Sequence, residues 1–234
     1  MSFNLLHFKN LPILEQLKIE EALLRCDTRN FCIINEGSTP AVVLGISGKV
    51  DELVDREMAV KSSLPLIRRF SGGGTVVVDG STLFVTFICQ KEQHLFPIFP
   101  EPILKWSEEL YQEVFANPLF KLKENDYALG DKKCGGNAQY LKKERWLHHT
   151  SFLWDYCPIL MGHLLHPKKT PSYRAGRSHA EFLCTLKEFL PTRDHFLTSL
   201  KTALQKRYGL TELSPSEIAP ILQLPHRQTT QLLT

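Results

Sequence analysis

Strand-like and helical segments are segregated along this chain, and their order restricts the fold more than any single motif does. Runs rich in Val, Ile and Phe, punctuated by glycine, dominate up to Trp154, whereas apolar residues after Pro158 mostly recur at helical spacing. This order predicts an α+β fold with a mixed, largely antiparallel β-sheet and flanking helices, rather than a doubly wound sheet. We expect helices at 13–26, 51–64, 101–115, 158–166, 179–190, 193–209 and 214–224, strands at 31–35, 41–46 and 75–89, and an antiparallel meander over 120–154.

Two local signals refine this organisation. Asp79-Gly80-Ser81 lies between two β-rich runs and predicts a hairpin. Residues 166–178 are rich in Pro, Gly and basic side chains, and they mark the one plausible boundary in the chain. We therefore expect a main domain over residues 1–177. The segment 178–234 is marginal as an independent domain, so we expect a helical tail packed on the main domain.

Charge, cysteine spacing and hydropathy exclude several classes of protein. The formal charge of +3 is too small to indicate a nucleic-acid binder. The apolar runs are too short to span a bilayer, and the first residues do not resemble a signal peptide. None of the six cysteines forms a CxxC pair. We expect a cytoplasmic protein with no metal site of its own and with neither nucleic acid nor membrane as a partner.

The stretch RRFSGGGTVVVDG, residues 68–80, places three consecutive glycines between two arginines and a run of valines. One interpretation is a bulged bend at a sheet corner, because glycine runs mark such bends. The other is an anion site, in which backbone N–H groups and Ser71 face a phosphate or carboxylate and Arg68 or Arg69 neutralises it. The stretch is neither a P-loop nor a dinucleotide fingerprint, because both spacings are absent.

A second glycine-bounded element, GDKKCGGNAQ at residues 130–139, carries two lysines. A lysine close to a phosphate site can hold a carboxylate or an acyl phosphate by its point charge. The alternative is that Lys132 and Lys133 are solvated turn residues. Together, the two elements favour a substrate whose phosphate and acyl carbonyl are bound side by side.

Four motifs in order, RRFSGGGTVVVD, ENDYALGDKKCGGNAQ with its Asn-Asp pair and its lysine–glycine signature, and RWLHHTSFLW, closely resemble the lipoate–protein ligase family. This family shares its catalytic fold with biotin–protein ligases and octanoyltransferases, and the resemblance covers roughly residues 15–177. It implies activation of lipoate or octanoate with ATP and Mg²⁺, giving an acyl-adenylate and pyrophosphate. The acyl group would then pass to a lysine of a lipoyl domain, in an E2 subunit of a 2-oxoacid dehydrogenase complex or in the glycine cleavage H protein.

The resemblance also implies roles for individual residues. Lys133 matches the motif lysine, which would neutralise the reacting carboxylate and stabilise the developing charge on the carbonyl. Asn125 and Asp126 match the pair that reaches ATP or its magnesium, and His149 would line the acyl pocket. The full set implied to bind substrate or ATP is Arg69, Ser71, Gly72, Gly73, Gly74, Thr75, Val76, Val77, Asn125, Asp126, Gly136, Ala138 and His149.

Other functions remain open at this stage. Octanoyltransferases of the superfamily use a cysteine thioester, but no cysteine lies in KENDYALGD, and Cys134 would point to the strand face opposite Lys133. That favours a ligase over an ATP-independent octanoyl or lipoyl transferase. The tail is too short for a full accessory domain, so a separate accessory protein is a further possibility. A binding protein that sequesters lipoate, and a biotin ligase, are the remaining alternatives.

Overall fold

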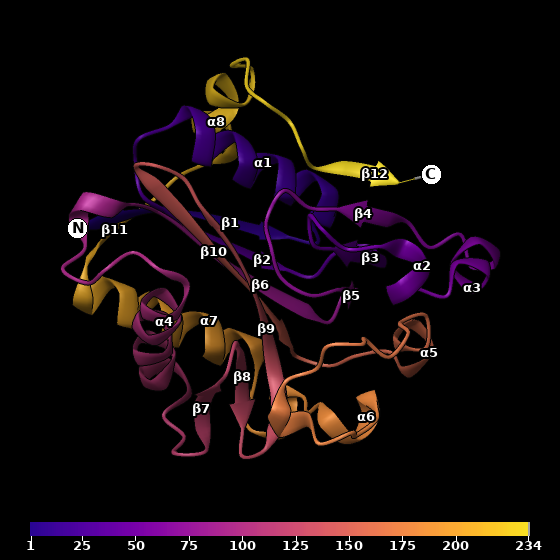
Figure 1. Ribbon diagram of the computed structural model, residues 1–234. Helices are drawn as coiled ribbons and strands as arrows, with labels where there is room; N and C mark the ends of the chain where they lie inside the picture. Colours follow the sequence, from indigo (N-terminus) through magenta and orange to yellow (C-terminus); the bar gives the residue numbers. More distant parts are fainter. Residues whose placement is uncertain (234) are drawn as a thin grey trace.

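The computed structural model describes residues 1–233 as helices packed around two β-sheets (Figure 1). The elements in chain order are β1 (Ser2–Lys9), α1 (Ile13–Cys26), β2 (Phe31–Glu36), β3 (Ala41–Leu44), α2 (Val50–Leu53), α3 (Arg56–Lys61), β4 (Leu66–Arg68), β5 (Val76–Val78), β6 (Thr82–Gln90), η1 (Lys91–Gln93), α4 (Pro100–Phe115), β7 (Phe120–Lys123), β8 (Asp126–Leu129), β9 (Lys132–Leu141), β10 (Arg145–Leu153), α5 (Pro158–Met161), η2 (Ser172–Arg174), α6 (His179–Phe182), η3 (Leu186–Glu188), α7 (Arg193–Arg207), β11 (Gly209–Glu212), α8 (Pro215–Leu222) and β12 (Gln231–Leu233).

The strand pairing confirms the predicted α+β class. Within the described residues, the large sheet has eight strands in the order β11-β1-β2-β6-β10-β9-β8-β7, and the small sheet has four in the order β12-β4-β3-β5. Most pairs are antiparallel, while β1 runs parallel to β2 and β11, and β3 runs parallel to β4. The predicted meander is present, because β7, β8, β9 and β10 pair successively in antiparallel register.

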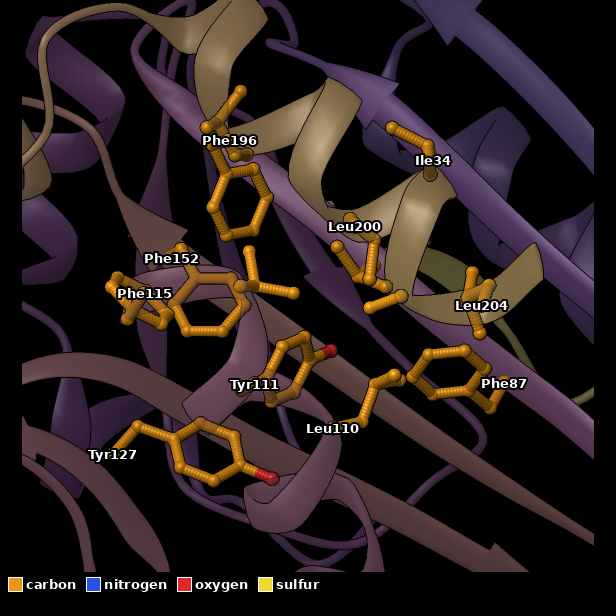
Figure 2. Close-up of a cluster of buried hydrophobic side chains, with 14 of the residues drawn as sticks. Ile34, Phe87, Leu110, Tyr111, Phe115, Tyr127, Phe152, Phe196, Leu200 and Leu204 are labelled. Carbon is orange, nitrogen blue, oxygen red and sulfur yellow. The ribbon is translucent and has the colours of Figure 1, made fainter. Parts of the chain in front are cut away.

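The large sheet buries apolar side chains on both faces, as the two-residue period of a strand requires. In β2, Cys32 and Ile34 join the core on one face, and Phe31 and Ile33 join the core on the other. Helices α4 and α7 cover the first face, and Figure 2 shows their side chains meeting the aromatic residues of the sheet. Helix α1 covers the opposite face, next to the small sheet.

The predicted hairpin at residues 75–89 is wrong in its pairing. The turn itself forms, with the Ser81 N–H donating to the Asp79 carboxylate at 2.7 Å. The strands on either side of it separate, however, because β5 pairs with β3 in the small sheet. Strand β6 is already paired on both edges, with β2 and β10. A turn motif therefore joins two sheets here and does not close a hairpin.

Three predicted helices are shorter than the apolar spacing indicates. The segment 51–64 breaks at Val54, which adopts an extended conformation and forms a β-bridge with Leu164. That bridge also lies beyond the end of α5, so the helix expected at 158–166 stops at Met161. The segment 179–190 breaks at Leu183, where the next residue, Cys184, donates its N–H to the Lys133 carbonyl. In each case a tertiary backbone contact overrides local helical spacing.

The terminal strands were not predicted. Strand β1 lies between β2 and β11, and β12 adds an edge to the small sheet next to β4. The segment before β12 is fixed by Glu21, a buried carboxylate of α1 that accepts the N–H groups of Thr229 and Thr230. The expected helical tail thus contains α7 and α8, but it also contributes one strand to each sheet.

No helix within residues 1–233 is both long enough and apolar enough to cross a bilayer. The expectations of a cytoplasmic location and of no membrane partner stay predictions.

Candidate functional site

The glycine loop, residues 71–74, joins β4 of the small sheet to β5 and lies against β9 of the large sheet. The Gly72 N–H donates to the Gln139 carbonyl at 3.1 Å, and the Ser71 carbonyl accepts from Ile46 at 3.0 Å. These two bonds place the loop between the sheets. The structure therefore brings the first motif next to the second one, although about sixty residues separate them in the sequence.

Arg69 organises this loop from inside the protein. Its side chain is buried, and Nη2 donates to the carbonyls of Gly72 at 3.2 Å and Gly74 at 2.7 Å. Burial lowers the pKa of Arg69 to about 10, and the carboxylate of Glu20 opposes that shift. The guanidinium is thus occupied by backbone carbonyls. Its expected contact with an adenylate stays a prediction.

The fold requires glycine at only one of the three positions of the glycine loop. Gly73 has φ of +114°, and an added Cβ would lie 2.7 Å from Nη2 of Arg69 and 2.9 Å from the Asn137 carbonyl oxygen. At Gly72 the nearest atom would be 3.8 Å away, and at Gly74 no atom of the described chain lies within 4 Å. Only Gly73 is required by the fold. The other two leave open space over the loop.

Two hydroxyl groups beside this loop are buried without partners. Ser71 Oγ and Thr75 Oγ1 form no hydrogen bond to any of the described residues. A buried hydroxyl without a partner costs free energy, so such groups indicate a ligand or water.

Val76 and Val77 follow in β5, where Val77 packs against apolar residues next to α3 and Val76 packs next to α1.

Lys133 lies at the start of β9 and forms an ion pair with Asp126 of β8. Lys133 Nζ is 2.8 Å from Asp126 Oδ1, and both side chains are mostly buried. A Cβ on Gly136 would lie 3.3 Å from this Nζ, so the glycine leaves room for the lysine head group. Asn125 is exposed, and its carbonyl accepts from Asn137 Nδ2 at 3.0 Å. The structure thus joins Lys133, Asp126 and Gly136 directly.

The two histidines of the RWLHHTSFLW motif lie within β10, not in a turn, and point to opposite faces of that strand. His149 lies opposite Ala138 of β9 and contacts Glu20 of α1, with Nδ1 at 2.9 Å from Oε1. His148 is fully buried, with Nε2 at 3.2 Å from Ser107 Oγ. Burial lowers the pKa of His148 to about 3, so this imidazole is neutral. His149 alone faces the small-sheet side, where the glycine loop lies.

Sequence reasoning missed Glu20. The carboxylate is completely buried and also accepts from Gln16 Nε2 at 2.8 Å and Thr86 Oγ1 at 2.7 Å. The signal was present, because Glu20 comes three residues after Leu17 and four before Leu24, which places it on the apolar stripe of α1. A carboxylate on an apolar stripe predicts a buried partner, and that partner is His149.

No dedicated metal centre forms within residues 1–233, where no group of three or more His, Cys, Asp or Glu side chains could hold an ion. Asp126 is a single carboxylate, and Tyr173 and Lys133 contact its two oxygens.

Cys134 is buried among apolar residues on the α4 face, and burial raises the pKa of its thiol. This position agrees with the expectation that Cys134 points to the strand face opposite Lys133.

Known proteins resemble the chain in sequence and in fold. The family described as lipoyl protein ligase A/B catalytic domain matches residues 12–208. The inactive lipoate–protein ligase 2 of Plasmodium falciparum (isolate 3D7) is 29% identical over 79% of this chain and 64% of its own length. The chain spans 34% to 64% of the first curated relatives it matches.

Solved structures agree with the fold. A lipoate–protein ligase A bound with ATP superimposes with a TM-score of 0.74 at 19% identity, covering 95% of this chain and 93% of that one. The bi-partite lipoate protein ligase of Thermoplasma acidophilum, studied with its E2 lipoyl domain, gives 0.72 at 17% identity, covering 95% and 91%. Because the family match extends over most of the sequence, the chain belongs to the lipoyl protein ligase A/B catalytic domain family, which has the biotin/lipoate ligase catalytic fold.

Proposed function

We propose that this protein is an ATP-dependent lipoate–protein ligase. Its substrates are ATP with Mg²⁺ and lipoate or octanoate, and its acceptor is a lysine of a lipoyl domain in an E2 subunit or H protein. One observation carries the proposal: a mostly buried lysine, Lys133, lies on β9, and the glycine loop with its unpartnered hydroxyl groups lies against the same strand. A cation and a glycine loop with unpartnered hydroxyl groups on one strand suit a mixed anhydride.

The reaction has two steps. First, the lipoate carboxylate attacks the α-phosphorus of ATP, and pyrophosphate leaves as the acyl–phosphate bond forms. Second, the neutral ε-amine of the acceptor lysine attacks the carbonyl carbon. AMP leaves with the electron pair of the broken C–O bond, and the nitrogen releases one proton to solvent as the amide forms. The nucleophile of each step comes from a substrate, so the enzyme supplies position and charge rather than an internal nucleophile.

The roles of the residues follow from this chemistry. Lys133 neutralises the carboxylate and then the carbonyl oxygen as charge develops. The amides of residues 73–75, with the hydroxyls of Ser71 and Thr75, face the α-phosphate. His149, fixed by Glu20, lines the acyl chain. Mg²⁺ arrives with ATP and is held largely by phosphate oxygens, which suits a site with a single carboxylate.

Three alternatives retain specific support. The family includes both A and B ligase types, so transfer from an acyl carrier without ATP is the alternative enzyme activity. The bi-partite ligase with a similar fold supports a version of the ligase that needs a separate accessory subunit. A curated relative is named inactive, which supports the binding-protein alternative.

A lipoyl-domain mass assay distinguishes these functions. We expect one lipoyl mass to be added with ATP, Mg²⁺ and lipoate, and no addition when ATP is omitted. Lys133→Ala should abolish it, whereas Lys132→Ala, at the exposed neighbour, should retain it. Modification from octanoyl-carrier protein without ATP indicates the transferase. Modification from preformed lipoyl-AMP alone indicates a missing accessory subunit. Binding of lipoate with no turnover from any donor identifies the binding protein.

A further inference from the structure

Residues 171–177 lie within the segment 166–178 that the sequence marks as a boundary, and they are hydrogen-bonded to both ends of the strand that carries Asp126. The Glu124 carboxylate, in the turn before β8, accepts the N–H groups of Ser172 at 2.7 Å and Tyr173 at 3.4 Å. Beyond the other end of β8, Arg177 Nη2 donates to the Asp131 carbonyl at 2.9 Å. The segment therefore holds both ends of β8 and does not behave as a linker.

Within this segment, Tyr173 reaches the ion pair of the candidate site. Its hydroxyl donates to Asp126 Oδ2 at 3.0 Å, while Lys133 Nζ binds Oδ1 of the same carboxylate at 2.8 Å. Burial, together with the neighbouring Asp126 carboxylate, raises the pKa of Tyr173, so the phenol stays protonated and donates. The Asp126 carboxylate thus connects Tyr173 and Lys133, through one hydrogen bond and one ion pair.

The ring of Tyr173 has two close neighbours. Its centroid lies 5.1 Å from that of Phe182 in α6, and Lys123 Nζ lies 5.6 Å from it. A packed aromatic ring has little rotamer freedom, so its hydroxyl is aimed at one place. The backbone of Lys133 is held by the segment that follows α6, because its carbonyl accepts the N–H of Cys184.

A lysine needs such support because its ammonium group lies at the end of a flexible four-carbon chain. Asp126 restricts the ammonium only if the carboxylate itself cannot rotate about its terminal torsion, which is a broad one. A hydrogen bond to Oδ2 prevents that rotation while Oδ1 holds the lysine. Loss of the Tyr173 hydroxyl would leave the ion pair formed but less well placed.

We propose that Tyr173 is a positioning residue for acyl transfer, which acts through Asp126 to hold the Lys133 ammonium group where the substrate carbonyl arrives. This inference rests on the proposed role of Lys133. Tyr173 orders the Asp126 carboxylate, Asp126 orders the lysine, and only the lysine touches the reacting atoms. A displacement of the charge by a fraction of an ångström lowers the rate and leaves substrate binding intact.

The first test compares Tyr173→Phe with Tyr156→Phe. Both residues pack on the cluster of Met161, Phe182 and Leu183, so Tyr156→Phe controls for packing. With preformed lipoyl-AMP and a lipoyl domain, we expect Tyr173→Phe to lower kcat on the order of tenfold, the effect of losing one hydrogen bond to a charged group, with KM unchanged. Glu124→Gln, an exposed change that loosens the segment, should lower kcat in the same direction.

The second test does not depend on activity. A short pulse of an amine-reactive acetyl ester at pH 8, followed by peptide mass spectrometry, measures how fast Lys133 reacts. We expect Tyr173→Phe and Glu124→Gln to label Lys133 several-fold faster than the wild type and Tyr156→Phe do, because the ion pair is loosened. Exposed Lys132 in the same peptide region is the internal reference.

The outcomes separate the two proposals. An unchanged kcat for Tyr173→Phe, with or without faster labelling, overturns the positioning role. An equal loss in Tyr156→Phe also overturns it, because packing then explains both variants. If the wild type transfers nothing from any donor, the proposed function fails, and the labelling rates alone decide whether Tyr173 holds Lys133. Equal labelling in all variants then overturns the inference.

Discussion

Oε1 of Glu20 lies 2.9 Å from Nδ1 of His149, and this contact joins α1 to β10 inside the protein. The same carboxylate accepts from Thr86, so α1, β6 and β10 share one buried side chain. A side chain that belongs to no recognised motif thus orients one that does.

Removal of that carboxylate should destabilise the protein. Glu20→Ala leaves the buried donors of Gln16, Thr86 and His149 without an acceptor, and we expect the free energy of unfolding to fall by about 1–3 kcal/mol. The matched control is Glu15→Ala, an exposed change on the same helix. Urea denaturation followed by circular dichroism measures both. Equal midpoints for the two variants would show that the network contributes nothing.

Alanine substitutions at Gly73 and Gly74 test separately whether the glycine loop contributes to stability and to ATP binding. Gly73→Ala forces a side chain into a positive φ and against Arg69, so we expect a loss of stability of about 1–3 kcal/mol. Gly74→Ala meets no described atom, so the free energy of unfolding should change by less than about 0.5 kcal/mol. If the loop binds the α-phosphate, Gly74→Ala should still raise KM for ATP. Wild-type kinetics in Gly74→Ala would place the phosphate elsewhere.

Stability should decrease as the pH falls, because His148 is buried in its neutral form. Its pKa is lowered to about 3 in the folded protein and is ordinary in the unfolded chain. As the pH falls below about 6.5, this imidazole therefore binds a proton only in the unfolded state. Each further unit of pH then lowers the free energy of unfolding. Between pH 8 and pH 5 this amounts to about 2 kcal/mol.

The histidine responsible can be identified by substitution. His148→Asn should lose about 2 kcal/mol less stability between pH 8 and pH 5 than the wild type does, whatever its stability at pH 8. His195→Asn, at an exposed position, should follow the wild type. Urea midpoints at the two pH values give the comparison. His94, whose pKa burial lowers to about 4, supplies a residual slope in every variant. An unchanged slope in His148→Asn would assign the effect to His94 and other groups.

The Cys134 thiol should be unreactive in the native protein. Burial raises the pKa of its thiol, so little thiolate is present at neutral pH. We expect iodoacetamide to label the half-buried Cys26 and Cys157 in the native protein at pH 7.5 and to leave Cys134 unlabelled. Cys134→Ser should retain acyl transfer. Loss of transfer together with a trapped acyl-thioester on Cys134 would establish the transferase mechanism instead.

Much of the secondary structure followed from periodicity. The helices at α1, α4 and α7 and the meander of β7 to β10 form where their apolar spacing predicts them. Period alone could not assign pairing partners, however. Strands β5 and β6 are joined by a turn typical of a hairpin and yet belong to different sheets, because each finds its partner far away in the chain. Val54 and Leu183 interrupt predicted helices for the same reason.

The candidate site divides in the same way. The local sequence was enough to single out Gly73 and Lys133. A positive φ favours glycine, and a lysine beside a glycine-rich turn indicates an anion site. The partners of these residues cannot be read locally. Tyr173 reaches Asp126 from a distant segment, and Glu20 reaches His149 across 129 positions. Sequence thus determined which chemical groups are present, and only tertiary packing decided which of them meet, because burial and long-range contacts set those distances.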